Sequence, residues 1–97
     1  MKRFVLALAV LTCSVTGAAA VQCYEAKATV NQSAPSDKCT QKEKGYANTG
    51  KGPLTHAGCT AAKNQAANKL RMRLSATCRG YVQTFASCTV INVGSCN

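Results

Sequence analysis

The sequence predicts a small, disulfide-stapled α+β domain, with one helix packed on a short antiparallel sheet. Three observations predict this class. The chain has 97 residues and 7 cysteines, a density typical of scaffolds that fold in an oxidising compartment. One uninterrupted run of helix-forming residues lies in its second half, and stretches with strand-like patterns lie on both sides of that run. A chain this short holds one domain at most.

The first twenty residues are predicted to be a secretory signal. A basic start, Met1 to Arg3, precedes the apolar run from Phe4 to Leu11, and small residues lead to Ala20. This is the order of parts in a cleaved signal peptide. We expect cleavage before Val21, which leaves one secreted or periplasmic domain, residues 21–97, with no transmembrane segment after processing.

Two other fates of this segment were weighed. It could remain as an uncleaved anchor, but its fully apolar core is short for a membrane span. Cys13 could instead be lipidated, but Thr12 before it is larger than that processing accepts. We therefore expect Cys13 to be discarded with the signal.

The cysteines of residues 21–97 are even in number, which predicts three disulfides and no free thiol. They are Cys23, Cys39, Cys59, Cys78, Cys88 and Cys96. Their spacing does not select a pairing, and it contains no Cys-x-x-Cys of a zinc or redox site. Each bridge should contribute about 2 to 4 kcal/mol, so reduction is expected to unfold the domain or nearly so.

The first element after the signal is a strand. From Tyr24 to Val30 apolar and polar residues alternate, as in a half-buried strand. Residues 31–58 hold four glycines, two prolines and few apolar side chains, and are predicted to form a long loop held by Cys39. Asn31 begins a glycosylation sequon, which matters only where the protein is secreted through an endoplasmic reticulum.

The strongest element is a helix from Thr60 to Thr77, where no Gly or Pro interrupts residues that favour helices. At 100° per residue one stripe is formed by Cys59, Ala62, Ala66, Leu70, Leu74 and Thr77. We expect this stripe to pack on the sheet, with Leu70 and Leu74 buried. The opposite side is formed by Asn64, Gln65, Asn68 and Ser75. Gly80 is suited to a left-handed helix stop.

The C-terminal stretches 81–85 and 89–93 are rich in β-branched and aromatic residues. Since Ala86 and Ser87 lie between them near a turn, a hairpin is predicted. Together with the strand at 24–30 it would form the sheet on which the helix packs.

No pattern identifies an enzyme or a cofactor. His56 is the one histidine, which excludes catalysis by a histidine pair. A one-histidine ribonuclease that uses Glu25 or Glu43 with His56 fits by composition alone. Residues 45–51 satisfy the G-x-x-x-x-G-K pattern of phosphate loops, but Gly52 stands where Ser or Thr would bind Mg²⁺, so we interpret the match as chance. No metal site or cofactor is predicted.

Positive charge is the broadest functional hint. Residues 21–97 carry 10 basic and 3 acidic side chains, a net charge of 10 − 3 = +7. The candidate binding residues form one group in the loop and one on the helix: Lys38, Lys42, Lys44 and Lys51, then Lys63, Lys69, Arg71 and Arg73. Such surfaces attract anionic partners. Only Tyr46 is available there to stack bases, so specific nucleic-acid binding is not predicted.

Three functions remain open from the sequence. The leading one is a non-enzymatic binding protein, secreted or periplasmic, that docks on an acidic protein, a glycan or an envelope polymer. The second is a cationic toxin, antimicrobial or effector that acts on anionic membranes, although the alanine-rich stripe of the helix is poor in bulky residues for insertion. The third is the one-histidine ribonuclease.

Overall fold

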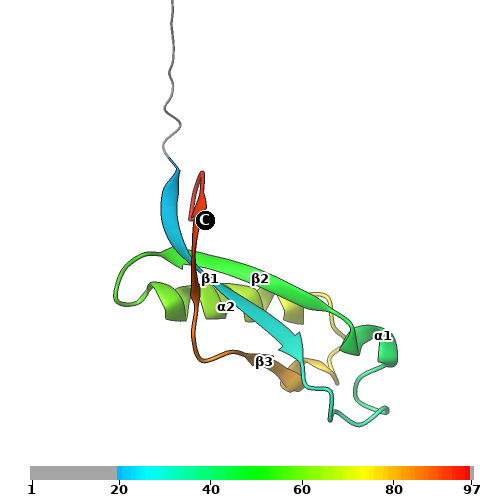
Figure 1. Cartoon of the computed structure of the whole chain (residues 1–97). Helices are drawn as coiled ribbons and strands as arrows, with labels where there is room; N and C mark the ends of the chain where they lie inside the picture. Colours follow the sequence, from blue (N-terminus) through cyan, green and yellow to red (C-terminus); the bar gives the residue numbers. More distant parts are fainter. Residues whose placement is uncertain (1–19, 97) are drawn as a thin grey trace, which may run out of the picture.

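The structure, a computed structural model, describes residues 20–96 and has two layers, a sheet and a helix (Figure 1). The elements are β1 (Val21–Val30), α1 (Gln41–Lys44), β2 (Ala47–Pro53), α2 (Gly58–Arg71), the 3₁₀ helix η2 (Arg79–Tyr81), β3 (Val82–Thr84) and β4 (Thr89–Val93). This confirms the predicted α+β class. Residues 1–19 of the predicted signal, Cys13 included, lie outside the described residues.

The sheet is antiparallel, and β1 is its central strand. β2 pairs with one edge of β1, and β3 and β4 pair with its other edge. The predicted hairpin is therefore wrong, because β3 and β4 do not pair with each other. They follow one another along β1 in the same direction, and the four residues 85–88 between them lie opposite only two, Ala26 and Lys27. A local bulge thus separates two halves of one interrupted strand.

The predicted loop at 31–58 is wrong in part, because it contains α1 and β2. The sequence Ala-Asn-Thr-Gly-Lys-Gly-Pro of β2 has the composition of a turn, yet it pairs with β1 from Ala47 to Pro53. The glycines have a packing role. A Cβ on Gly50 would lie 2.4 Å from the backbone oxygen of Ala62, and one on Gly52 would lie 2.1 Å from the backbone oxygen of Gly58. Glycine therefore lets α2 pack directly on β2.

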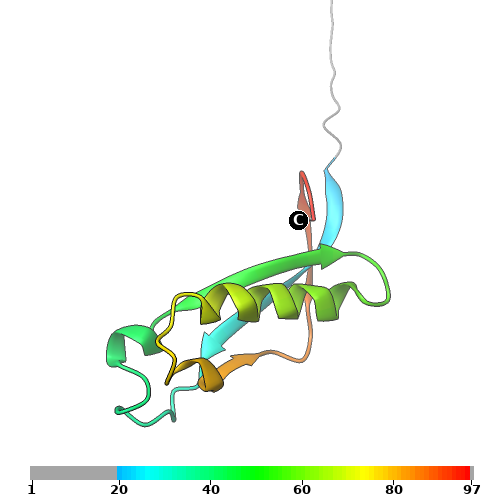
Figure 2. The ribbon, with the colours of Figure 1, turned by 180° about the vertical axis from the view of Figure 1, so that it is seen from behind.

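Helix α2 lies across one face of the sheet, as Figure 2 shows from the helix side. It ends at Arg71, six residues before the predicted end. The turn after it still returns Leu74 to the core, so the predicted burial of Leu70 and Leu74 is confirmed. Thr77, the last residue of the predicted stripe, is exposed.

Two further details of the predicted helix are corrected. Gln65 does not face solvent opposite the core, because its Oε1 accepts a hydrogen bond from the Lys51 backbone N–H, 2.8 Å away. Gly80 does not stop the helix, because it lies in η2, well beyond the end of α2, and its φ is not in the left-handed region.

The described residues contain three disulfides, Cys23–Cys96, Cys39–Cys78 and Cys59–Cys88. This confirms full pairing of the predicted six cysteines. The Cys39–Cys78 disulfide lies inside the main apolar cluster, which contains Ala28, Val30, Ala34, Cys39, Ala66, Leu70, Leu74 and Cys78. Most of these side chains are small. The disulfide sulfurs thus supply much of the bulk of this core.

Leu70 is the largest fully buried side chain, and its truncation measures the helix–sheet contact. Leu70→Ala is expected to lower the free energy of unfolding by about 2 to 4 kcal/mol, because it removes buried methyl groups and leaves a cavity. Asn68→Ala, on the exposed side of the same turn, is the control and should be near neutral. Denaturant titration of both variants checks this, and equal losses would show that Leu70 does not pack as described.

Candidate functional site

The short helix α1 is positioned by a capping box. The Thr40 Oγ1 accepts a hydrogen bond from the Glu43 N–H, and the Glu43 carboxylate accepts one from the Thr40 N–H. The Thr-x-x-Glu spacing is a sequence signal for a helix start, and it lies within the stretch that was predicted to be a loop. This box fixes the direction in which Glu43 points.

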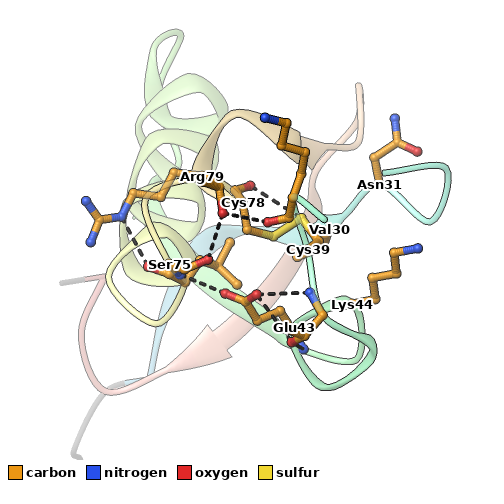
Figure 3. Close-up of a disulfide and its surroundings, with 12 residues drawn as sticks. Val30, Asn31, Cys39, Glu43, Lys44, Ser75, Cys78 and Arg79 are labelled. Atoms are coloured by element: carbon orange, nitrogen blue, oxygen red, sulfur yellow. Dashed lines mark hydrogen bonds between the residues drawn. A yellow bond between two sulfur atoms is a disulfide. The ribbon is translucent and has the colours of Figure 1, made fainter. Parts of the chain in front are cut away.

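Glu43 also joins α1 to the turn that follows α2. Its Oε2 accepts a hydrogen bond of 2.7 Å from the backbone N–H of Ser75 (Figure 3). Two more links lie beside it, the Cys39–Cys78 disulfide and a hydrogen bond of 2.9 Å from Thr77 Oγ1 to the Lys38 carbonyl. Together they hold α1 and the residues before it against the turn that follows α2.

The hydrogen bond from the Ser75 backbone N–H, and then the one from the Thr40 backbone N–H, hold the pKa of the Glu43 carboxyl below its ordinary value of 4.5. A lowered pKa means that the folded state favours the ionised carboxylate. Its contribution to stability is therefore present above the unfolded-state pKa and is lost as the pH falls through the folded-state pKa.

Glu43→Gln is expected to destabilise the protein at neutral pH and to make little difference in acid. Protonated glutamic acid resembles glutamine, so the gap between wild type and variant should close as the pH falls from the ordinary carboxyl value of 4.5 through the lower folded-state pKa. Denaturant titrations of both proteins across that range measure the gap. A gap that does not change with pH would show that the carboxylate charge has no part in this junction.

Two arginines near this junction are held by neutral groups. Arg73 Nη1 donates to the Ala47 carbonyl, 3.1 Å away, and to Asn48 Oδ1, 2.8 Å away, while its guanidinium carbon lies 4.4 Å from the centre of the Tyr46 ring. Arg79 Nε donates to the carbonyls of Arg71 and Leu74. These partners orient both guanidinium groups without neutralising their charge.

The junction therefore gathers basic side chains from distant parts of the chain. Lys42 and Lys44 lie in the last turn of α1, and Lys69 and Arg71 lie in the last turn of α2. In Figure 3 the side chains of Lys44 and Arg79 extend away from the ribbon on different sides of the disulfide. We call this end of the domain the basic end, and define it by its basic residues Lys38, Lys42, Lys44, Lys69, Arg71, Arg73 and Arg79.

The basic end includes six of the eight binding residues predicted from the sequence. The structure brings most of the two predicted groups to the same end of the domain. Lys51 and Lys63 lie apart from it: Lys51 lies on β2 opposite Glu25 of β1, and Lys63 lies half-buried in the first half of α2. Arg79 was missed as a candidate, because only the turn after α2 brings it back to the helix end.

Two of the groups considered for ribonuclease chemistry, Glu43 and His56, lie at different places. His56 is exposed in the turn after β2, whereas Glu43 precedes β2 and is engaged by Thr40 and Ser75. The seven residues of β2 separate them, a span of about 20 Å. The G-x-x-x-x-G-K stretch begins at Gly45, the C-cap of α1, and contains most of β2, where it is an extended strand beside β1.

Among residues 20–96 no cluster of His, Cys, Asp and Glu is arranged to hold a metal ion, and no pocket is found. Nor does this part of the chain contain a helix whose length and hydropathy would let it cross a membrane. Comparison with protein-family models, with curated proteins and with solved structures found no match to this chain.

Proposed function

We propose that the protein is a non-enzymatic binding protein, secreted or periplasmic, which docks its basic end on an anionic partner. That partner would be an acidic protein, a glycan or an envelope polymer. One observation carries the proposal: the guanidinium groups of Arg73 and Arg79 are oriented by neutral acceptors, so their charges remain available beside five further basic side chains. Fixed cations bind an anion with less loss of side-chain freedom than mobile ones do.

Charge reversal at the basic end tests the proposal. Lys42→Glu and Arg71→Glu alter α1 and α2 separately, and each is expected to weaken binding at least about threefold, because each changes the charge near the partner by two units. Lys27→Glu is the matched control. It makes the same charge change on an exposed position of β1, on the sheet face that α2 does not cover, and should change binding little.

The oxidised protein is first used to capture partners from its native compartment, and heparin and polyglutamate serve as defined anionic probes. Affinity for the captured partner should fall with salt, since the attraction acts over about 8 Å at physiological ionic strength. Reversals at Lys42, Arg71 and Lys27 that weaken binding equally would contradict a localised site. Leakage from anionic vesicles would favour the alternative function as a toxin, and cleavage of purified RNA would favour the alternative function as a ribonuclease.

A further inference from the structure

The two edges of the sheet differ in how they are protected. In an antiparallel pair, the N–H and C=O groups of alternate residues face the partner strand or face away from it. The Lys51 N–H donates to Gln65 and the Ala47 carbonyl accepts from Arg73. The outward-facing backbone groups of β2 are therefore those of residues 47, 49, 51 and 53, which point away from β1. Several groups on this edge are occupied by α2 and by the turn that follows it.

β2 has further protection at its end. Pro53 has no N–H, and its carbonyl accepts a hydrogen bond of 2.8 Å from Thr55. A positively charged residue, Lys51, lies in the same strand. Proline, charge and covering side chains are the devices by which proteins keep edge strands from pairing with other chains.

β4 forms the opposite edge and has none of these devices. Given the pairing of β1 with β2, the backbone N–H and C=O groups of the odd-numbered β1 residues face β4. The Asn31 N–H, which donates to the Tyr81 carbonyl on that side, follows the same alternation. The N–H and C=O groups of Val90 and Asn92 therefore face outward, and within residues 20–96 the one strand that pairs with β4 is β1.

The segment that forms this edge carries no charge and exposes two large apolar side chains. No residue from Gly80 to Cys96 is charged, although residues 21–97 carry +7. Val90 is 51% exposed and Phe85 is 53% exposed. Figures 1 and 2 show β4 and the start of β1 extending past α2, and within residues 20–96 no helix covers β4. The sequence Thr-Val-Ile-Asn-Val also has high β-propensity.

We propose that two copies of this protein associate by pairing the free edges of their β4 strands antiparallel about Ile91. In this register Val90 lies opposite Asn92 of the second copy and Asn92 lies opposite its Val90. All four outward-facing N–H and C=O groups of each copy are then paired. The arrangement is a closed two-fold dimer that joins two sheets into one.

Charge favours a second copy over an anionic partner at this edge. An anionic partner finds no cation between Gly80 and Cys96, whereas a second uncharged edge meets no repulsion. The basic end lies at α1 and the C-terminal end of α2, away from β4 (Figure 1). The dimer therefore keeps the two basic surfaces apart. It does not depend on the proposed anion binding, and its test uses no anionic partner.

Sedimentation equilibrium of the oxidised protein, purified after secretory expression of the full chain, tests the dimer. A five-residue edge gives a small interface, so we expect a monomer–dimer equilibrium between about 10 μM and about 1 mM. Val90→Pro should reduce association at least about tenfold, because it removes an outward N–H without touching the β1 pairing. Val90→Thr keeps that N–H and is the matched control, expected to associate like wild type.

A pair of charge variants tests the register and does not depend on the folding of Val90→Pro. Ile91→Lys alone and Ile91→Glu alone should each be monomeric, because like charges would meet at the two-fold axis. An equal mixture of the two should dimerise again. A wild-type chain that stays monomeric up to about 1 mM overturns the proposal. So does a dimer that Val90→Pro leaves unchanged, or a mixture that shows no recovery.

Discussion

Gly50→Ala is expected to destabilise the domain by about 3 kcal/mol, a large loss for the addition of one methyl group. The added Cβ would lie 2.4 Å from the carbonyl oxygen of Ala62 and 2.4 Å from the backbone nitrogen of Ala66. Both atoms belong to the backbone of α2, so no side-chain rotation can relieve the overlap. The helix would have to move away from β2, which would open the packing around it.

Guanidinium unfolding followed by circular dichroism measures this loss. Gly80→Ala is the control, because nothing lies within 4 Å of a Cβ built at Gly80 and its φ is not in the left-handed region. Its effect should stay within about 0.5 kcal/mol. If Gly50→Ala were as harmless as Gly80→Ala, the close contact between α2 and β2 would be wrong.

Removing the buried disulfide is expected to be the most destabilising change of all. The double variant Cys39→Ala/Cys78→Ala releases a link between residues 39 positions apart, which by loop closure alone is worth about 4 kcal/mol. Both cysteines are fully buried in the main apolar cluster, so the variant also leaves unfilled space beside Leu70. We expect a domain that is largely unfolded at 37 °C.

The Cys59→Ala/Cys88→Ala variant is the matched comparison. It opens a link of similar span, 29 positions, but both cysteines are only half-buried. Its loss in free energy of unfolding should therefore be smaller. The difference is the part of the first variant's loss that comes from core packing. Intact mass first confirms that each variant has formed its two remaining disulfides. The two variants are then compared by unfolding without reductant. Equal losses would show that loop closure alone sets the stabilisation.

The pairing of β3 and β4 with β1 explains why the predicted hairpin was wrong. Local sequence identified both stretches as strands, since β-branched residues favour extended backbone wherever they pair. It did not identify the partner, because the bulge between them has the same turn-like residues as a hairpin loop. The choice between the two pairings depends on β1, which lies more than fifty residues earlier in the chain.

Local patterns and composition alone determined the fold class, the strand at β1, the existence of α2, the even set of cysteines and the positive charge. These properties depend on neighbouring residues or on simple counts, so they can be read before folding. They also predicted the burial of Leu70 and Leu74. The partners in the three disulfides could not be predicted in this way, because the spacing of the cysteines along the chain permits many pairings.

Tertiary structure alone decided β2, the end of α2 and the basic end. The glycines of β2 indicate a turn by themselves, and they become strand residues because α2 packs too closely for any side chain. Lys42 and Arg71 come to the same end of the domain because Glu43 and the Cys39–Cys78 disulfide hold α1 against the turn that follows α2. In each case the deciding contact joins residues far apart in sequence, and its strength depends on distances that exist only after the chain has folded.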